Sequence, residues 1–144
     1  MLIRTVIFSI SVFILFSPFS SSDDTLSITP GKYLIVSTEK TNLSTVPKTV
    51  TNERCIMEKE FDPKITLPSP KLCSAANVKK KGNKITYDVT CKGDRSMPAM
   101  SGNVEFSSTG TMFTYDLKMN GSIEGTEYNV HNHGEGERLG ECGN

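Results

Sequence analysis

The stretch FTYDLKM, residues 113–119, alternates apolar and polar side chains without an error. Successive side chains of a β-strand point to opposite faces of a sheet, so this alternation predicts a strand with one buried face. KITYDVTC, residues 84–91, alternates in the same way. Strands that are apolar on one face only are typical of antiparallel sheets, in which one face meets the core and the other meets water.

Weaker strand patterns occur elsewhere in the chain, at 32–38 (KYLIVST), 48–56 (KTVTNERCI) and 104–106 (VEF). KYLIVST is apolar on both faces, so we expect it to be covered on both sides. Dipeptides typical of turns separate the strand patterns: Gly82-Asn83, Thr109-Gly110 and Asn120-Gly121. No convincing amphipathic helix pattern accompanies them.

Two stretches that contain proline predict irregular loops. Residues 57–72 hold three prolines, which exclude a regular element there apart from a short helical turn near 57–61. The second loop spans 94–102. The whole pattern predicts an all-β fold: a bent antiparallel sheet or open barrel of about seven or eight strands, with meander connections and two disulfides.

The first residues have the features of a secretory signal peptide. Arg4 precedes an apolar run at 5–16 that is too short to span a membrane as a helix, and small residues follow Pro18. Cleavage after Ser22 fits the small-residue rule, with cleavage after Ser20 or an uncleaved anchor as alternatives. We therefore expect a signal peptide at 1–22, a single secreted β domain at 23–144, and a periplasmic or secreted location.

Four cysteines fall in the expected mature domain, and an even number in a small exported chain predicts disulfides. A hairpin that turns at Gly82-Asn83 brings Cys73 opposite Cys91, close enough to bridge. We favour Cys73–Cys91, which leaves Cys55–Cys142, although four cysteines allow three pairings. The second bond would close a loop of about 88 residues, which the chain-entropy model values at about 4.5 kcal/mol.

The register of this hairpin carries a conflict. The pairing that joins the two cysteines differs by one residue from the pairing that places Ala76 and Val78 on the core face. A one-residue bulge near Ala75 satisfies both demands, because a bulge shifts the register of one strand only.

Several residues appear in a characteristic order: Pro30-Gly31-Lys32-Tyr33, Val89-Thr90-Cys91 and Arg138-Leu139-Gly140-Glu141-Cys142. This order resembles the proteobacterial secreted family known as domain of unknown function 3617, whose members end in Arg-x-Gly-Asp/Glu-Cys. The resemblance covers about residues 28–142. The family usually has Trp where this chain has Tyr33, which keeps an aromatic anchor. The resemblance implies an exported Gram-negative envelope protein and supplies no catalytic residue.

Composition excludes several classes of function. Sixteen Lys and Arg balance sixteen Asp and Glu, so no net charge draws the chain to nucleic acid or to an anionic surface. No stretch beyond the N-terminal run is apolar enough to span a bilayer. The sequence has no evident Ser-His-Asp set and no phosphate-binding loop. We expect a monomeric protein that is not an enzyme and needs no cofactor.

His131-Asn132-His133 contains both histidines of the chain. Residues i and i+2 of a strand share a face, so the two imidazoles predict a metal site that Glu135 or Glu137 would complete. The alternative is a polar, solvated strand end before the glycine-rich segment HGEGERLG, residues 133–140.

Other candidate groups each have two interpretations. Met97 and Met100, with Met57 in the other loop, offer soft ligands for copper(I) or else cover the edge of the core. A basic hairpin tip binds lipid phosphate or an acidic partner, or else prevents edge-to-edge aggregation. Its residues are Lys79, Lys80, Lys81 and Lys84.

Arg138 belongs to the closing structural motif with Gly140 and Cys142. It pairs with a carboxylate such as Glu53 or Asp116 and pins the last strand, or else it lines a binding site. We favour the structural interpretation, because Cys142 is expected to be structural too.

These observations favour a non-enzymatic envelope protein that holds an apolar small ligand or an envelope protein on one sheet face or at a barrel mouth. An apolar cavity in the fold would support this interpretation. One alternative is a protein-directed inhibitor or chaperone-like module that acts through the two loops that contain proline. The other is metal capture through His131 and His133.

Overall fold

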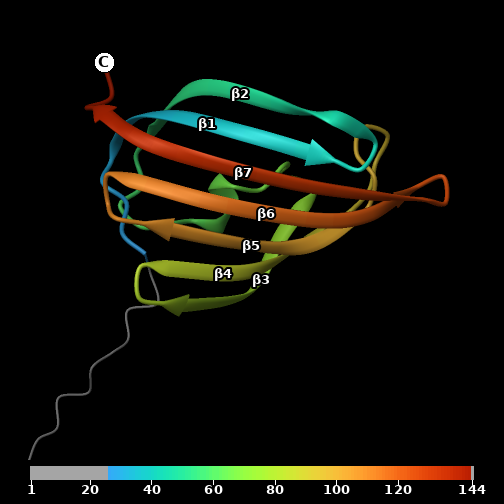
Figure 1. Ribbon diagram of the computed structural model, residues 1–144. Helices are drawn as coiled ribbons and strands as arrows, with labels where there is room; N and C mark the ends of the chain where they lie inside the picture. The colour runs from blue at the N-terminus through green and yellow to red at the C-terminus, as the bar shows by residue number, and fades with distance from the viewer. Residues whose placement is uncertain (1–25, 144) are drawn as a thin grey trace, which may run out of the picture.

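The computed structural model describes residues 26–143, which form one antiparallel sheet of seven strands (Figure 1). This confirms the predicted fold class. The predicted signal peptide, residues 1–22, lies outside the described residues. The elements are β1 (Gly31–Thr41), β2 (Ser44–Ile56), the 3₁₀ turn η1 (Pro63–Ile65), β3 (Cys73–Lys81), β4 (Lys84–Cys91), β5 (Met100–Ser108), β6 (Met112–Ile123) and β7 (Thr126–Gly140).

The strands follow the order β2-β1-β7-β6-β5-β4-β3 across the sheet. Strands β3 to β7 form a meander, in which each strand pairs with the next. The first hairpin, β1 and β2, then adds beside β7 through pairing of β1 with β7. The last strand therefore lies inside the sheet, and β2 and β3 form its two edges.

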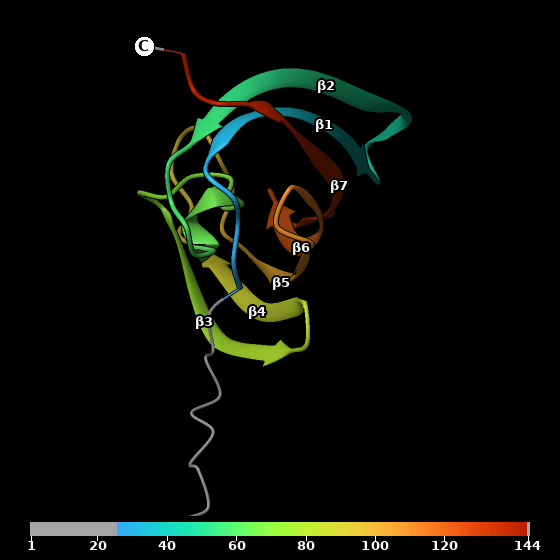
Figure 2. The same ribbon diagram turned by 90° about the vertical axis from the view of Figure 1, so that its left-hand side faces the viewer.

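The sheet curls strongly, and the connection from β2 to β3 lies inside the curve (Figure 2). This connection must cross from one edge of the sheet to the other, so it runs over the concave face. Its apolar residues Phe61 and Leu67 are buried there. Leu26 and Ile28 are buried beside it, through hydrogen bonds from Phe61 N to Leu26 O (2.7 Å) and from Ile28 N to Lys59 O (3.0 Å).

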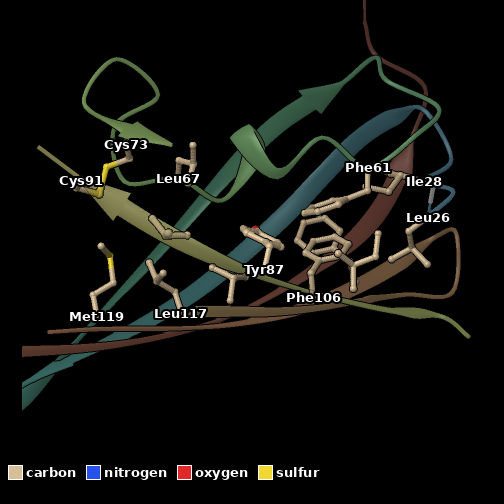
Figure 3. Close-up of a cluster of buried hydrophobic side chains, with 14 of the residues drawn as sticks. Leu26, Ile28, Phe61, Leu67, Cys73, Tyr87, Cys91, Phe106, Leu117 and Met119 are labelled. Atoms are coloured by element: carbon tan, nitrogen blue, oxygen red, sulfur yellow. A yellow bond between two sulfur atoms is a disulfide. The ribbon is translucent and has the colours of Figure 1, made fainter. Parts of the chain in front are cut away.

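Five aromatic rings form a continuous row in the core, Tyr87, Phe61, Phe106, Phe113 and Tyr33. Phe61 stacks on Phe106 with ring centroids 3.9 Å apart (Figure 3). Phe106 stacks in turn on Phe113 at 5.3 Å. The row fastens the β2–β3 connection to the concave face, because Phe61 comes from that connection and the other rings come from strands.

The glycine-rich segment HGEGERLG continues β7 to Gly140, so His131-Asn132-His133 lies within the strand and is not the strand end that the alternative interpretation expected. Gly134 and Gly136 are buried on the concave face, opposite Tyr115 and Phe113 of β6. A Cβ atom at Gly136 would lie 2.2 Å from Cζ of Phe113, and one at Gly134 would lie 2.2 Å from Cε1 of Tyr115. The two glycines therefore leave the space that the neighbouring rings fill.

We expect Gly136→Ala to lower the free energy of unfolding by about 1–3 kcal/mol, the usual cost of overpacking a core. Urea unfolding measures this change. Gly143→Ala is the matched control, because nothing lies within 4 Å of a Cβ at Gly143. Combining Gly136→Ala with Phe113→Leu should cost less than the sum of the two single changes. Additive costs would show that the ring does not occupy the space over Gly136.

Both disulfides have the favoured pairing, Cys55–Cys142 and Cys73–Cys91. Cys73 pairs directly with Cys91 across the β3–β4 hairpin. Cys55 lies on edge strand β2, and Cys142 follows β7. Since β1 lies between β2 and β7, the Cys55–Cys142 bond links the two strands that flank β1.

The bulge in the β3–β4 hairpin lies between Ala76 and Lys79, two residues beyond the predicted position. Asn77 there has φ of 54°, a left-handed conformation that Asn adopts more readily than Ala. Its Nδ2 donates to Asp88 Oδ2 at 2.7 Å. The predicted inward faces were wrong as a result, because Ala76 and Val78 are exposed.

Two further expectations need correction. Strand β1 is not covered on both faces, since Val36 is 39% exposed on the convex side. The helical turn of the 57–72 loop occurs at η1 rather than near 57–61. Pro63 begins it, and Asp62 Oδ1 accepts from Lys64 N at 2.9 Å, because proline suits a first helical position and aspartate suits a cap.

Candidate functional site

A pocket of about 390 Å³ lies on the concave face, away from the Phe61–Phe106 end of the core. Its walls come from strands β1, β5, β6 and β7 and from both loops that contain proline. Most of its lining is apolar: Pro68, Met97, Pro98, Met100, Leu117, Met119, Tyr128 and Val130. Its polar lining is Glu39, Thr66, Ser96 and Asn132.

The strand register places the floor of this pocket. Leu117 lies opposite Asn132, and Met119 lies opposite Val130, in the β6–β7 pairing. Figure 3 shows Leu117 and Met119 side by side, at the end of the core that also holds the Cys73–Cys91 bond. Rigid strands thus form the floor.

The loop 94–102 forms one side of the pocket and is held by Asp94. Asp94 Oδ1 accepts from Ser96 N and Ser96 Oγ at 2.7 Å and from Met97 N at 3.0 Å. The hydrogen bond from the Ser96 side chain is the main cause of a lowered pKa of Asp94. This turn places Met97 against the core cluster and in the pocket wall.

The loop 57–72 forms the other side through Thr66 and Pro68. Thr66 Oγ1 hydrogen-bonds to Tyr87 Oη and donates to Pro63 O at 3.1 Å. Burial raises the pKa of Tyr87, so this hydroxyl stays protonated. The two loops, which strands β3 and β4 separate in the sequence, therefore meet at this pocket.

One polar atom in this pocket has no partner. Asn132 Oδ1 is buried and accepts no hydrogen bond from any described residue. Asn132 lies between Leu117 of β6 and Glu39 of β1 in the sheet register. Since buried acceptors are normally satisfied, this oxygen is free to accept a hydrogen bond from a group bound in the pocket.

Asn132, Glu39 and Val130 line this pocket but were not predicted as site residues from the sequence. The sequence did contain a pattern that points to this site. The inward-facing positions of β7 are Tyr128, Val130 and Asn132, so a polar residue interrupts an otherwise apolar face. We interpreted His131 and His133 instead, which point to the convex side.

Asp116 bridges the two histidines on that convex face. Its Oδ1 lies 2.8 Å from His131 Nε2, and its Oδ2 lies 3.2 Å from His133 Nδ1. His133 Nε2 lies 3.4 Å from Glu135 Oε1. Within residues 26–143, no three His, Cys, Asp or Glu side chains are placed to hold a metal ion. Metal capture through His131 and His133 stays a prediction that the geometry does not strengthen.

We expect His133 to titrate above its usual value of 6.5. Desolvation lowers the pKa of His133, but hydrogen bonds to Glu135 and Asp116 outweigh it and the net pKa is raised. A raised native pKa means that this stabilisation is complete below pH 6.5 and is lost as the pH rises through the native pKa. It is small, because the side chain is 45% exposed.

NMR titration of the imidazole signals measures this pKa. Asp116→Asn should move the His133 midpoint back toward 6.5, since it removes one of the two carboxylates. A wild-type midpoint at or below 6.5 would contradict the bridged arrangement.

The comparisons with known proteins give a family. A family model matches residues 28–142, which include all seven strands and all four cysteines. The chain belongs to the family described as Protein of unknown function (DUF3617). No curated protein matches the chain, and no solved structure matches it. Across residues 26–143, no helix has the length and apolar character to cross a membrane.

In this DUF3617 member, Arg138 joins the two ends of the domain. Its Nε donates to Pro30 O at 2.9 Å, and its Nη2 pairs with Glu141. A Cβ at Gly31 would lie 2.5 Å from Arg138 Nε, so the guanidinium packs closely on that glycine. Neither expected carboxylate pairs with Arg138, because Glu53 binds Lys32 and Asp116 binds the histidines.

The remaining candidate residues are dispersed. Met97 and Met100 line the pocket, but Met57 lies beside the disulfide, with its Sδ 3.4 Å from Cys55 Sγ. Lys79, Lys80 and Lys81 of the basic tip end edge strand β3, and Lys84 begins β4 and pairs with Glu105 at 2.6 Å. Lysines on an edge strand discourage pairing with another sheet.

Proposed function

We propose that this chain is an exported, non-enzymatic binding module that holds a small molecule with an apolar body in the concave pocket. The observation that carries the proposal is the convergence of both loops that contain proline on an apolar pocket of about 390 Å³. Ligand pockets usually measure about 300–1,000 Å³ and are mostly apolar, with a few polar groups. A filled core would have argued against this function.

As in many binding sites, strands form the floor of the pocket and loops form its rim. Strands β6 and β7 supply Leu117, Met119 and Val130 as a fixed floor, and the loops supply Met97 and Pro68 above it. Each CH₂ group of a ligand that is buried there gains about 0.8 kcal/mol. Loops at the rim can adjust to the ligand, since they lack the hydrogen-bond ladder of the sheet.

Export to the periplasm or beyond is part of the proposal. Two disulfides and no free cysteine among the described residues support an oxidising compartment, because cytosolic thiols are kept reduced. The leader-like features of the first residues support it too.

The test is titration of the protein with N-phenylnaphthylamine, a neutral apolar dye whose emission rises in apolar surroundings. Val130→Phe should weaken binding about tenfold or more, because the ring fills space that the dye needs. The variant should keep its thermal stability, since the new ring enters a cavity rather than a packed site. Val36→Phe is the matched control, because Val36 is exposed on the convex face of β1.

Absence of dye binding by the wild type would overturn the proposal, and so would equal binding by Val130→Phe. Either result would favour the alternative of a protein-directed inhibitor or chaperone-like module that acts through the loops at 57–72 and 94–102. Loss of a captured envelope protein on deletion of 94–102 would then support that alternative.

A further inference from the structure

The unpartnered acceptor in the pocket, Asn132 Oδ1, indicates that the ligand carries a hydrogen-bond donor. Asn132 Oδ1 is buried and unsatisfied among the described residues, and leaving such an atom without a donor is costly. A ligand that brings an N–H or O–H group to this atom gains a hydrogen bond and removes that cost. A ligand that brings only acceptors gains neither.

The charge beside this acceptor is negative. Glu39 lies directly opposite Asn132 in the β1–β7 pairing, and both residues line the pocket. Glu39 is only partly exposed. Lys48 of edge strand β2 lies opposite Glu39, but no ion pair joins the two in the described part of the chain. A carboxylate and an amide oxygen side by side are complementary to an ammonium group.

We infer that the pocket takes a small amphiphile whose polar end is an ammonium group, with the nitrogen at Asn132 and Glu39 and the apolar body against Met119 and Val130. The inference rests on the proposed function of the pocket. A cavity of about 390 Å³ suits one short chain or ring system and not the paired acyl chains of a phospholipid. The ligand is therefore a free amine and not a membrane headgroup.

A competing arrangement exists nearby and makes the inference testable. A smaller pocket of about 130 Å³ shares Thr66 with the first and is lined by Arg54 and Asn52. An amphiphile with a carboxylate head would place it at Arg54 instead. Arg54 is exposed to solvent, whereas the Asn132 acceptor is buried, so the ammonium arrangement is favoured.

The experiment compares octylamine, octanol and octanoate by calorimetric titration at neutral pH, where the amine is a cation and the acid an anion. The three probes share one apolar body and differ in the head group. We expect octylamine to bind about tenfold more tightly than octanoate, since a hydrogen bond to a charged group is worth about that factor. Octanol, a neutral donor, should bind between them.

Two variants assign the effect to the named groups. Glu39→Gln should bring octylamine to the level of octanol and leave octanol unchanged. Asn132→Leu should weaken both donors and leave octanoate unchanged. Glu137→Gln is the matched control, because Glu137 is exposed on the convex face of β7.

The outcomes separate the two proposals. Binding of no probe would overturn the proposed function together with this inference. Equal affinities, or tightest binding of octanoate, would overturn the inference and leave the pocket as a binding site. Cosedimentation of the protein with phosphatidylethanolamine vesicles, without binding of octylamine, would overturn the choice of a free amine.

Discussion

Replacing Cys55 and Cys142 together with serine should lower the free energy of unfolding by about 4.5 kcal/mol. The bond joins residues 87 positions apart, so it restricts the unfolded chain strongly. It also fixes edge strand β2, which pairs with β1 alone and has only Ile56 buried. The free energy of unfolding of a native protein is usually about 5–15 kcal/mol, so losing this bond would remove a large share of the total stability. Urea unfolding of the oxidised proteins measures it.

The second disulfide provides the comparison. Cys73–Cys91 spans 18 positions, for which the same model gives about 3 kcal/mol. The Cys55–Cys142 variant should also lose amide protection along β2 first, because β2 pairs with β1 alone in the sheet. A change below about 1 kcal/mol, with β2 still protected, would contradict the structural role of the closing cysteine.

Phe106→Ala should lower the free energy of unfolding by about 3–5 kcal/mol, the usual cost of truncating a buried phenylalanine. Phe106 is 0% exposed and lies in the middle of the aromatic row. Its loss also removes the ring on which Phe61 stacks, so the β2–β3 connection should loosen. Thermal and urea unfolding give the first effect, and hydrogen exchange of residues 57–72 gives the second.

Two controls define the Phe106 effect. Phe106→Leu keeps most of the buried volume and should cost clearly less than Phe106→Ala. Leu139→Ala removes a side chain that is 51% exposed and should change stability by less than about 0.5 kcal/mol. Equal costs for Phe106→Ala and Leu139→Ala would show that the aromatic row does not hold the connection in place.

Strand alternation predicted the fold class because it depends on local geometry. Residues 113–119 and 84–91 became β6 and β4 with the expected faces. The turn at Gly82-Asn83 and a bulge in β3 together brought Cys73 opposite Cys91, as the sequence predicted. The family resemblance over residues 28–142 is likewise supported by the family match.

The insertion of β7 between β1 and β6 was not predictable from local patterns. It depends on pairing between residues about one hundred positions apart, such as Tyr33 with Arg138. The exact position of the bulge was not predictable either. It depends on the left-handed backbone conformation of Asn77 and on the hydrogen bond from its side chain to Asp88.

The pocket could not be predicted from the sequence either, because its lining residues are distant from one another along the chain. Its residues come from four strands and two loops, and only the curl of the sheet brings them together. The sequence pattern favoured His131 and His133 as site residues because imidazoles bind metals. Asp116 contacts both histidines on the convex face, away from the pocket. Asn132, between them in the sequence, turns to the other side and lines the pocket.

Native mass spectrometry of the protein purified from its own cells tests the central claim most directly. We predict that the wild type carries an added mass of a small organic molecule, which denaturation releases, and that Val130→Phe does not carry it. A wild type without any added mass, or the same added mass on Val130→Phe, would contradict a ligand in the concave pocket.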